Sequence, residues 1–184
     1  MNQENLPNST QTATFGGGCF WCTEALFQKL KGVESVESGY AGGNKANPSY
    51  EEVSTGLSGH AEAIQIKFDP KIISYQKLLD IFWHTHNPTT VNQQGADKGS
   101  QYRSIIFYHD DEQHKVAEQS KQEFNQSGAY SSPIVTQIVP FTNFYVAEEY
   151  HQNYYQNNSD APYCSVVIDP KLKKLVKEYS DDLK

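Results

Sequence analysis

Residues 12–22 read Thr-Ala-Thr-Phe-Gly-Gly-Gly-Cys-Phe-Trp-Cys, and this stretch decides the fold and the chemistry expected of the chain. Residues 12–15 predict a short β-strand, and the three glycines after it permit a tight turn and the close approach of another backbone. Cys19 follows the turn directly, at the start of a helix predicted over residues 20–31 that Gly32 ends. We therefore expect a strand, a turn and a helix, with a cysteine where the turn meets the helix.

Outward from this stretch, the first 108 residues predict the order strand, helix, strand, strand, helix, strand. The predicted ranges are 12–15, 20–31, 33–40, 61–68, 75–84 and 102–108. The remainder predicts helices over 110–126 and 144–155, a strand over 134–139, and a last helix from about 170 to 179. The sequence thus predicts an α/β (α+β two-layer) fold with a ferredoxin-like split βαβ core and additional C-terminal helices.

Length and composition indicate one domain. The chain has 184 residues, and we expect a flexible polar leader over 1–12 and a single domain over 13–184. No apolar run approaches the roughly 18 residues of a membrane span, so no membrane segment is expected. The net charge of −7 lacks the basic footprint of a nucleic-acid or anionic-membrane partner.

The cysteine content points to a reducing compartment. The chain has three cysteines, an odd number, and residues 1–12 lack the basic start and apolar stretch of a secretory signal. We expect a cytoplasmic monomer in which the thiols are chemical rather than structural. Three cysteines and a histidine could in principle bind zinc, but the usual second Cys-x-x-Cys or His pair is missing, so no metal is expected.

Cys19 is the predicted nucleophile. The positive end of a helix dipole lowers the pKa of a thiol, and Phe20 and Trp21 supply rings that would shape a pocket beside it. Cys22 lies three residues on, where it is either a redox partner of Cys19 or a buried helix residue. Cys164 is expected in a loop that could swing toward Cys19, or it is a passive thiol.

Four further residues are candidates for polar roles. Glu62 lies on a strand face that it shares with Ile64 and Ile66, and a buried carboxyl there would have a raised pKa and could donate a proton. Tyr50, Asp97 and Tyr102 lie in or beside loops and could supply hydrogen bonds to a ligand. His151 is interpreted as a packed or hydrogen-bonded helix residue.

Several motifs in order resemble one known family, the A-type peptide methionine sulfoxide reductases. The resemblance covers roughly residues 13–175. It rests on the following segments: Gly18-Cys19-Phe20-Trp21, Gly39-Tyr40-Ala41-Gly42-Gly43, Tyr50-Glu51-Glu52-Val53, Gly59-His60-Ala61-Glu62, Phe82-Trp83-His84, Gln94-Gly95-Ala96-Asp97, Gln101-Tyr102-Arg103-Ser104, Glu148-Glu149-Tyr150-His151-Gln152 and Tyr163-Cys164.

The resemblance implies a specific reaction. Cys19 would attack the sulfur of a methionine-S-sulfoxide, free or in an oxidised protein, and Glu62 would protonate the oxygen. Tyr50 and Tyr102 would hydrogen-bond that oxygen and Asp97 would support the polar side, while Phe20 and Trp21 would hold the methyl group. Cys19 would become a sulfenic acid, and the disulfide formed from it would be reduced by thioredoxin, or by dithiothreitol in vitro, without any cofactor.

This chain differs from the family pattern at Cys22. Many members of the family have glycine at this position, and cysteines of a glycine-rich C-terminal tail resolve the sulfenic acid instead. Both Cys164 and Cys22 are candidates for the resolving thiol, and we expect Cys164 to act first. Two other functions remain open at this point. They are a general thiol–disulfide oxidoreductase built on Cys19 and Cys22, and a module that senses oxidised methionine without turnover.

Overall fold

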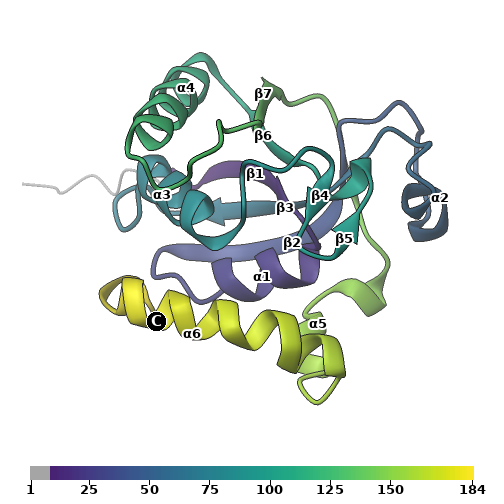
Figure 1. The fold of residues 1–184 in the computed structure, drawn as a ribbon. Coiled ribbons are helices and arrows are strands. Elements are labelled where there is room, and N and C mark those ends of the chain that lie inside the picture. The colour runs from purple at the N-terminus through teal and green to yellow at the C-terminus, as the bar shows by residue number, and fades with distance from the viewer. Residues whose placement is uncertain (1–8) are drawn as a thin grey trace, which may run out of the picture.

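The computed structural model describes residues 9–184, in which one mixed six-stranded sheet has the order β7-β6-β1-β3-β2-β8 (Figure 1). All neighbouring strands are antiparallel except β6 and β7. The strands are β1 Gln11–Gly17, β2 Val33–Ala41, β3 Ala61–Phe68, β6 Ser104–Tyr108, β7 Gln137–Pro140 and β8 Phe144–Val146, and a separate small hairpin pairs β4 Gln93–Gln94 with β5 Asp97–Lys98.

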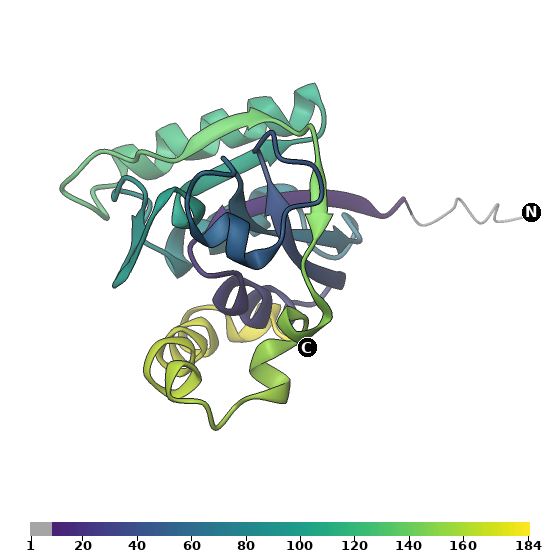
Figure 2. The ribbon, with the colours of Figure 1, turned by 90° about the vertical axis from the view of Figure 1, so that its right-hand side faces the viewer.

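In the described part of the chain, six α-helices accompany the sheet. They are α1 Phe20–Phe27, α2 Tyr50–Ser54, α3 Tyr75–Thr85, α4 Asp111–Gln126, α5 Tyr154–Asn157 and α6 Asp169–Tyr179. Helix α6 lies along the outer side of α1, and α4 lies beside α3 (Figures 1 and 2). Within residues 9–184, no helix is long and apolar enough to cross a membrane.

The elements β1-α1-β2-β3-α3-β6 reproduce the expected order of strands and helices, and the α/β class with added C-terminal helices is confirmed. Alternation along β3 explains the two cores. Ile64 and Ile66 pack with Phe15 and the helices α1 and α3 on one face. Ala61 and Ala63 face a smaller cluster on the other side, with Ile105, Phe107, Val139, Phe141 and Phe144.

Local signals explain where the short elements begin. Ser49 and Glu52 form a reciprocal capping box that starts α2, in which the Ser49 hydroxyl accepts from the Glu52 amide at 3.2 Å and the Glu52 carboxylate accepts from the Ser49 amide at 2.9 Å. Ser74 caps α3 in the same way as Ser49 caps α2, by accepting from the Lys77 amide at 3.1 Å. Helix α1 differs, because Cys19 precedes it and supplies no side-chain cap.

The helix predicted over residues 144–155 is wrong. Phe144–Val146 form β8, which pairs with Gly39–Ala41 of β2, and a 3₁₀ turn at Glu149–His151 precedes the short α5. Aromatic and β-branched residues suit an edge strand. Asn153 adopts a left-handed conformation with φ of 53°, which interrupts any continuous helix here. The side chain of Gln152 continues the strand contacts, accepting from Ser38 N at 3.0 Å and donating to Ser38 O at 2.9 Å.

Other boundaries also differ from the sequence expectation. Helix α1 ends at Phe27 rather than 31. Cys164, which was expected in a loop, begins a π-helical turn over residues 164–168 that leads into α6. The predicted leader 1–12 lies outside the described residues over 1–8, and its last two residues, Gln11 and Thr12, belong to β1.

The packing of β8 on β2 gives a testable prediction. A Cβ atom on Gly39 would lie 2.4 Å from Cζ of Phe144 and 2.5 Å from the carbonyl oxygen of Tyr145, closer than real contacts allow. Gly39→Ala should therefore lower the free energy of unfolding by about 1–3 kcal/mol, measured by urea denaturation. Glu37→Ala, at an exposed position of the same strand, is the control and should change it little. Equal stability of both variants would contradict this packing.

Candidate active site

Cys19 lies between the glycine turn and α1, as the sequence predicts. Gly18 has φ of +93°, and a Cβ atom there would lie 2.6 Å from Cγ of Gln94, so only glycine suits the turn. Residue Cys19 is 8% exposed, which leaves its thiol in a nearly closed site. The turn thus fixes the thiol at the point where β1, α1 and the β4–β5 hairpin meet.

The carboxyl group of Glu62, a residue of β3, lies at the N-terminus of α1. Its Oε2 accepts a hydrogen bond from the backbone N–H of Phe20 at 3.0 Å, so this carboxyl from β3 caps a helix that has no side-chain cap of its own. Burial raises the pKa of Glu62 to about 8, despite the lowering by the Phe20 N–H, and the charges of Asp97 and Cys22 raise it further. Glu62 is therefore mostly protonated at neutral pH, with Oε1 free to carry the proton.

The pKa of Cys19 shifts in the direction opposite to our sequence expectation. Burial raises the pKa of the thiol well above its usual value, and a hydrogen bond with Cys22 and the nearby Glu62 raise it further. The expected lowering by the helix N-terminus fails because Glu62 already takes the Phe20 N–H, and because α1 has only eight residues. In the ligand-free protein Cys19 is a protonated thiol.

Cys22 lies within hydrogen-bonding reach of Cys19, and this contact is the first cause that lowers the pKa of Cys22 to about 7. Its Sγ also lies 3.7 Å from the hydroxyl of Tyr163. Cys164 is fully buried at the start of the π-helical turn, where burial raises the pKa of its thiol. All three cysteines are free thiols. The structure therefore places Cys22, and not Cys164, directly beside Cys19.

Two tyrosines face the same centre from different loops. Tyr50 is the first residue of α2, and its backbone N–H donates to Glu148 at 3.2 Å. Tyr102 ends the 3₁₀ turn Ser100–Tyr102. Burial raises the pKa of both phenols, and charges on Glu62, Asp97 and Cys19 raise them further, so both rings lie near these groups and stay protonated.

Trp21 is held in place on three sides. Its ring stacks on Tyr154 with centroids 3.7 Å apart and 7° between planes, and it meets the edge of Tyr163 at 5.7 Å. Its Nε1–H donates to Nδ1 of His151 at 3.0 Å. Phe20 is 1% exposed and lies against Tyr40 and His151, with centroids 5.7 and 5.1 Å away. An apolar wall therefore borders the thiol.

The sequence reasoning missed several supporting residues. Glu148 accepts from the Tyr40 hydroxyl at 3.1 Å and from the Tyr50 amide, which joins β2, α2 and the segment after β8. Tyr163 donates to Oδ2 of Asp97 at 2.9 Å, so Asp97 binds a neighbouring phenol. Buried His151, which was expected to be a packed or hydrogen-bonded helix residue, does form a hydrogen bond, but it lies in a 3₁₀ turn and orients Trp21. The segment of residues 148–152 was part of the family resemblance, but the sequence did not show which residues Glu148 and His151 contact.

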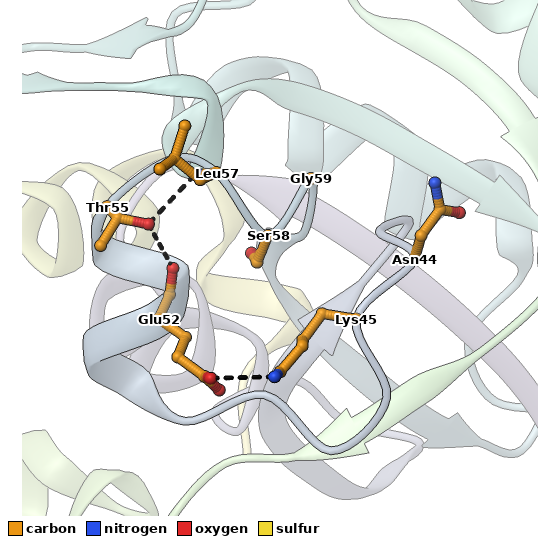
Figure 3. Close-up of a pocket in the computed structure, with 7 residues that line it drawn as sticks. All are labelled: Asn44, Lys45, Glu52, Thr55, Leu57, Ser58 and Gly59. Carbon is orange, nitrogen blue, oxygen red and sulfur yellow. Dashed lines mark hydrogen bonds and ion pairs between the residues drawn. The ribbon is translucent and has the colours of Figure 1, made fainter.

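A separate cavity of about 510 Å³ lies beside α2 (Figure 3). Its lining residues are Asn44, Lys45, Glu52, Thr55, Leu57, Ser58 and Gly59. Lys45 and Glu52 form an ion pair of 3.1 Å across it. The cavity contains none of the predicted site residues, so it is not the site built around Cys19. Over residues 9–184, no group of three or more His, Cys, Asp or Glu side chains is arranged to hold a metal ion.

Comparisons with known proteins point to one family. The sequence model of the family described as peptide methionine sulfoxide reductase matches residues 11–184. The peptide methionine sulfoxide reductase MsrA of Polynucleobacter asymbioticus is 53% identical over 174 residues, which are 95% of this chain and 91% of that protein.

Two solved structures are similar in fold. Mxr1 from Saccharomyces cerevisiae in reduced form has a TM-score of 0.80 at 37% identity, covering 86% of this chain and 91% of Mxr1. The same yeast protein in complex with Trx2 has a TM-score of 0.57 at 28% identity, with 82% and 91% covered. Since the family match extends over almost the whole chain, this protein belongs to the peptide methionine sulfoxide reductases of the A type, which are oxidoreductases.

Proposed function

We propose that this chain reduces methionine-S-sulfoxide to methionine, both in oxidised proteins and as the free amino acid, and so repairs oxidative damage. The observation that carries this proposal is the buried Glu62 carboxyl, which accepts the backbone N–H of Phe20, the residue after Cys19, and whose pKa burial raises to about 8. Loss of a sulfoxide oxygen requires a proton, and a buried acid beside a thiol supplies one where water is scarce. The single catalytic unit is the domain over residues 13–184.

Each group has a role in the first step. The Cys19 thiol attacks the sulfoxide sulfur and gives its proton to the oxygen, and Glu62 donates a second proton to the same oxygen. The Tyr50 and Tyr102 hydroxyls donate hydrogen bonds to the same oxygen, while Phe20 and Trp21 contact the methyl group. A bond forms between the two sulfur atoms, the sulfur–oxygen bond breaks, and the oxygen leaves as water. Water then attacks the Cys19 sulfur and gives one proton back to Glu62, the bond between the two sulfur atoms breaks, methionine leaves, and Cys19 becomes a sulfenic acid. Methionine sulfoxide is thereby reduced by two electrons and Cys19 is oxidised by two.

Cys22 is the thiol best placed to resolve the sulfenic acid. Its hydrogen bond with Cys19 and its lowered pKa favour attack by a Cys22 thiolate, with hydroxide leaving and taking a proton to become water. Cys164 is fully buried, and the thiol that affects it is Cys22, so it follows as the thiol that attacks the Cys19–Cys22 disulfide. This order reverses the preference for Cys164 that the sequence favoured.

A dithiol protein reduces the final disulfide. The complex of the yeast relative with Trx2 supports a thioredoxin as this partner, and dithiothreitol should replace it in vitro. The cycle as written needs no metal or organic cofactor, because sulfur carries both electrons at every step. A monomer in the cytoplasm, where dithiol reductants are maintained, completes the proposal.

Turnover with separate sulfoxide epimers tests the function. With thioredoxin or dithiothreitol as reductant, we expect methionine from the S epimer only. The methyl group must contact Phe20 and Trp21 while the oxygen meets the donors Glu62, Tyr50 and Tyr102, and only one epimer allows both. Cys19→Ser should form no methionine. Equal use of both epimers would contradict this pocket, and turnover by Cys19→Ser would contradict the nucleophile.

Removing the acid should slow the first step. Glu62→Gln keeps an oxygen for the Phe20 N–H but has no acidic proton, so single-turnover methionine release should fall about 10²–10⁴-fold. Because the pKa of Glu62 is about 8, wild-type release should decline as the pH rises through 8, and this limb should be absent in Glu62→Gln. An unchanged rate in the variant would remove the acid role.

Disulfide mapping by mass spectrometry after one turnover tests the order of the thiols. We expect a Cys19–Cys22 bond first in Cys164→Ser and a later bond to Cys164 in the wild type. Cys22→Ser should release methionine but accumulate the sulfenic acid, detectable by trapping with dimedone. A Cys19–Cys164 bond formed at the wild-type rate in Cys22→Ser would show that Cys22 is dispensable.

A further inference from the structure

The hydroxyl of Tyr163 lies between a carboxylate and the thiol pair. It donates to Oδ2 of Asp97 at 2.9 Å and lies 3.7 Å from Sγ of Cys22. Asp97 comes from the β4–β5 hairpin, Cys22 from α1 and Tyr163 from the segment before the π-helical turn. Three separate elements therefore meet at one phenolic oxygen, which the reaction as proposed so far does not use.

A phenol has one proton to donate and lone pairs with which to accept. In the reduced protein that proton is directed to Asp97, so the Cys22 thiol can only donate to the Tyr163 oxygen. When Cys22 loses its proton, the sulfur becomes an acceptor, and a small rotation of the O–H bond transfers the donor from Asp97 to the sulfur. A hydrogen bond to an ionised acceptor is about twice as strong as a neutral one.

We propose that the Tyr163 hydroxyl is a switchable donor that stabilises the Cys22 thiolate for attack on the Cys19 sulfenic acid. The hydroxyl donates to Asp97 until Cys22 loses its proton. This assignment rests on the proposed function and deepens its second step. The Cys22 thiolate forms the S–S bond, the S–O bond of Cys19 breaks, and the departing hydroxide takes a proton from solvent to become water. Cys19 and Cys22 leave the step as a disulfide, and Tyr163 keeps its proton throughout.

The groups that face Cys22 agree with this role. They are Cys19 from its own element, Glu62 of β3, Asp97 of β5, Tyr163, Cys164 of the π-helical turn and Lys171 of α6. The contacts of Cys19, Tyr163 and Lys171 lower the pKa of Cys22, whereas burial and the charge of Asp97 raise it. Burial and the nearby thiols raise the pKa of Tyr163 itself, so it acts as a donor and forms no phenolate.

A single-turnover experiment without reductant tests the assignment. Methionine release and Cys19–Cys22 disulfide formation are followed together in quenched samples between pH 6 and 9. Tyr163→Phe keeps the ring that meets Trp21 and removes only the hydroxyl. We expect the ratio of the disulfide-forming rate to the methionine-forming rate to fall about three- to tenfold at pH 7, because thiolate is lost faster than its nucleophilicity rises. The ratio should recover toward pH 9.

Two further variants sharpen the test. Tyr155→Phe is the matched control, since the Tyr155 hydroxyl also donates to a carboxylate, Asp169, at 2.6 Å, and the thiol near it is Cys164, which takes no part in the Cys19–Cys22 step. It should leave the ratio unchanged. The pH dependence of Cys22 alkylation, read by peptide mass mapping, should move upward in Tyr163→Phe and downward in Asp97→Asn, because the amide removes the charge that competes for the donor.

The outcomes separate this assignment from the function that it rests on. Methionine release with an unchanged ratio in Tyr163→Phe, or a Cys19–Cys164 bond formed without any Cys19–Cys22 species, would overturn the donor role alone. Alkylation profiles that move in the same direction in both variants would do the same. Absence of methionine from the wild type would overturn the proposed function, and this assignment with it.

Discussion

The hydrogen bond between the backbone N–H of Phe20 and Oε2 of Glu62 is the contact on which the rest of this site depends. It satisfies an amide at the start of α1, which lacks a side-chain cap, and it joins that helix to the centre of the sheet. It also fixes a carboxyl beside Cys19 in a place that water barely reaches. Burial outweighs the amide contact and raises the pKa of the carboxyl to about 8. The same hydrogen bond therefore joins α1 to the sheet and positions the acid beside Cys19.

The second half of the chain closes the site from the opposite side. Strand β8 adds to the sheet edge beside β2, and the turn after it brings Glu148 to α2 and His151 to Trp21. The segment before α6 then carries Tyr163 to the thiols. The aromatic wall and the polar centre therefore depend on residues more than a hundred positions from Cys19, and on the close fit of Phe144 over Gly39.

Local signals in the sequence were sufficient for much of this structure. The glycine turn, the alternation along Ala61–Phe68 and the helical spacing over residues 75–84 act over a few residues, so the order of the core elements and the place of Cys19 could be predicted. The same alternation placed Glu62 on the strand face of Ile64 and Ile66, although it left open whether the carboxyl is buried. These are properties that periodicity and turn chemistry encode.

Features that depend on distant contacts could not be predicted in this way. Residues 144–155 have apolar spacing that fits a helix, but pairing with β2 makes the first of them a strand. The pKa of Cys19 was expected to fall, because the sequence shows the helix N-terminus but not the carboxyl that occupies it. The contact between Asp97 and Tyr163 joins residues 66 positions apart, and no local sequence pattern predicts it.

The most direct test of the account is the protonation state of Glu62 in the folded, reduced protein. Carbon-13 NMR of side-chain carboxyls in protein labelled at glutamate, compared with the same spectra of Glu62→Gln, isolates the Glu62 signal as the pH is varied. We expect this carboxyl to titrate near pH 8 and to be protonated at pH 7. A titration near the ordinary value of 4.5 would contradict it, because an ionised Glu62 has no proton to give.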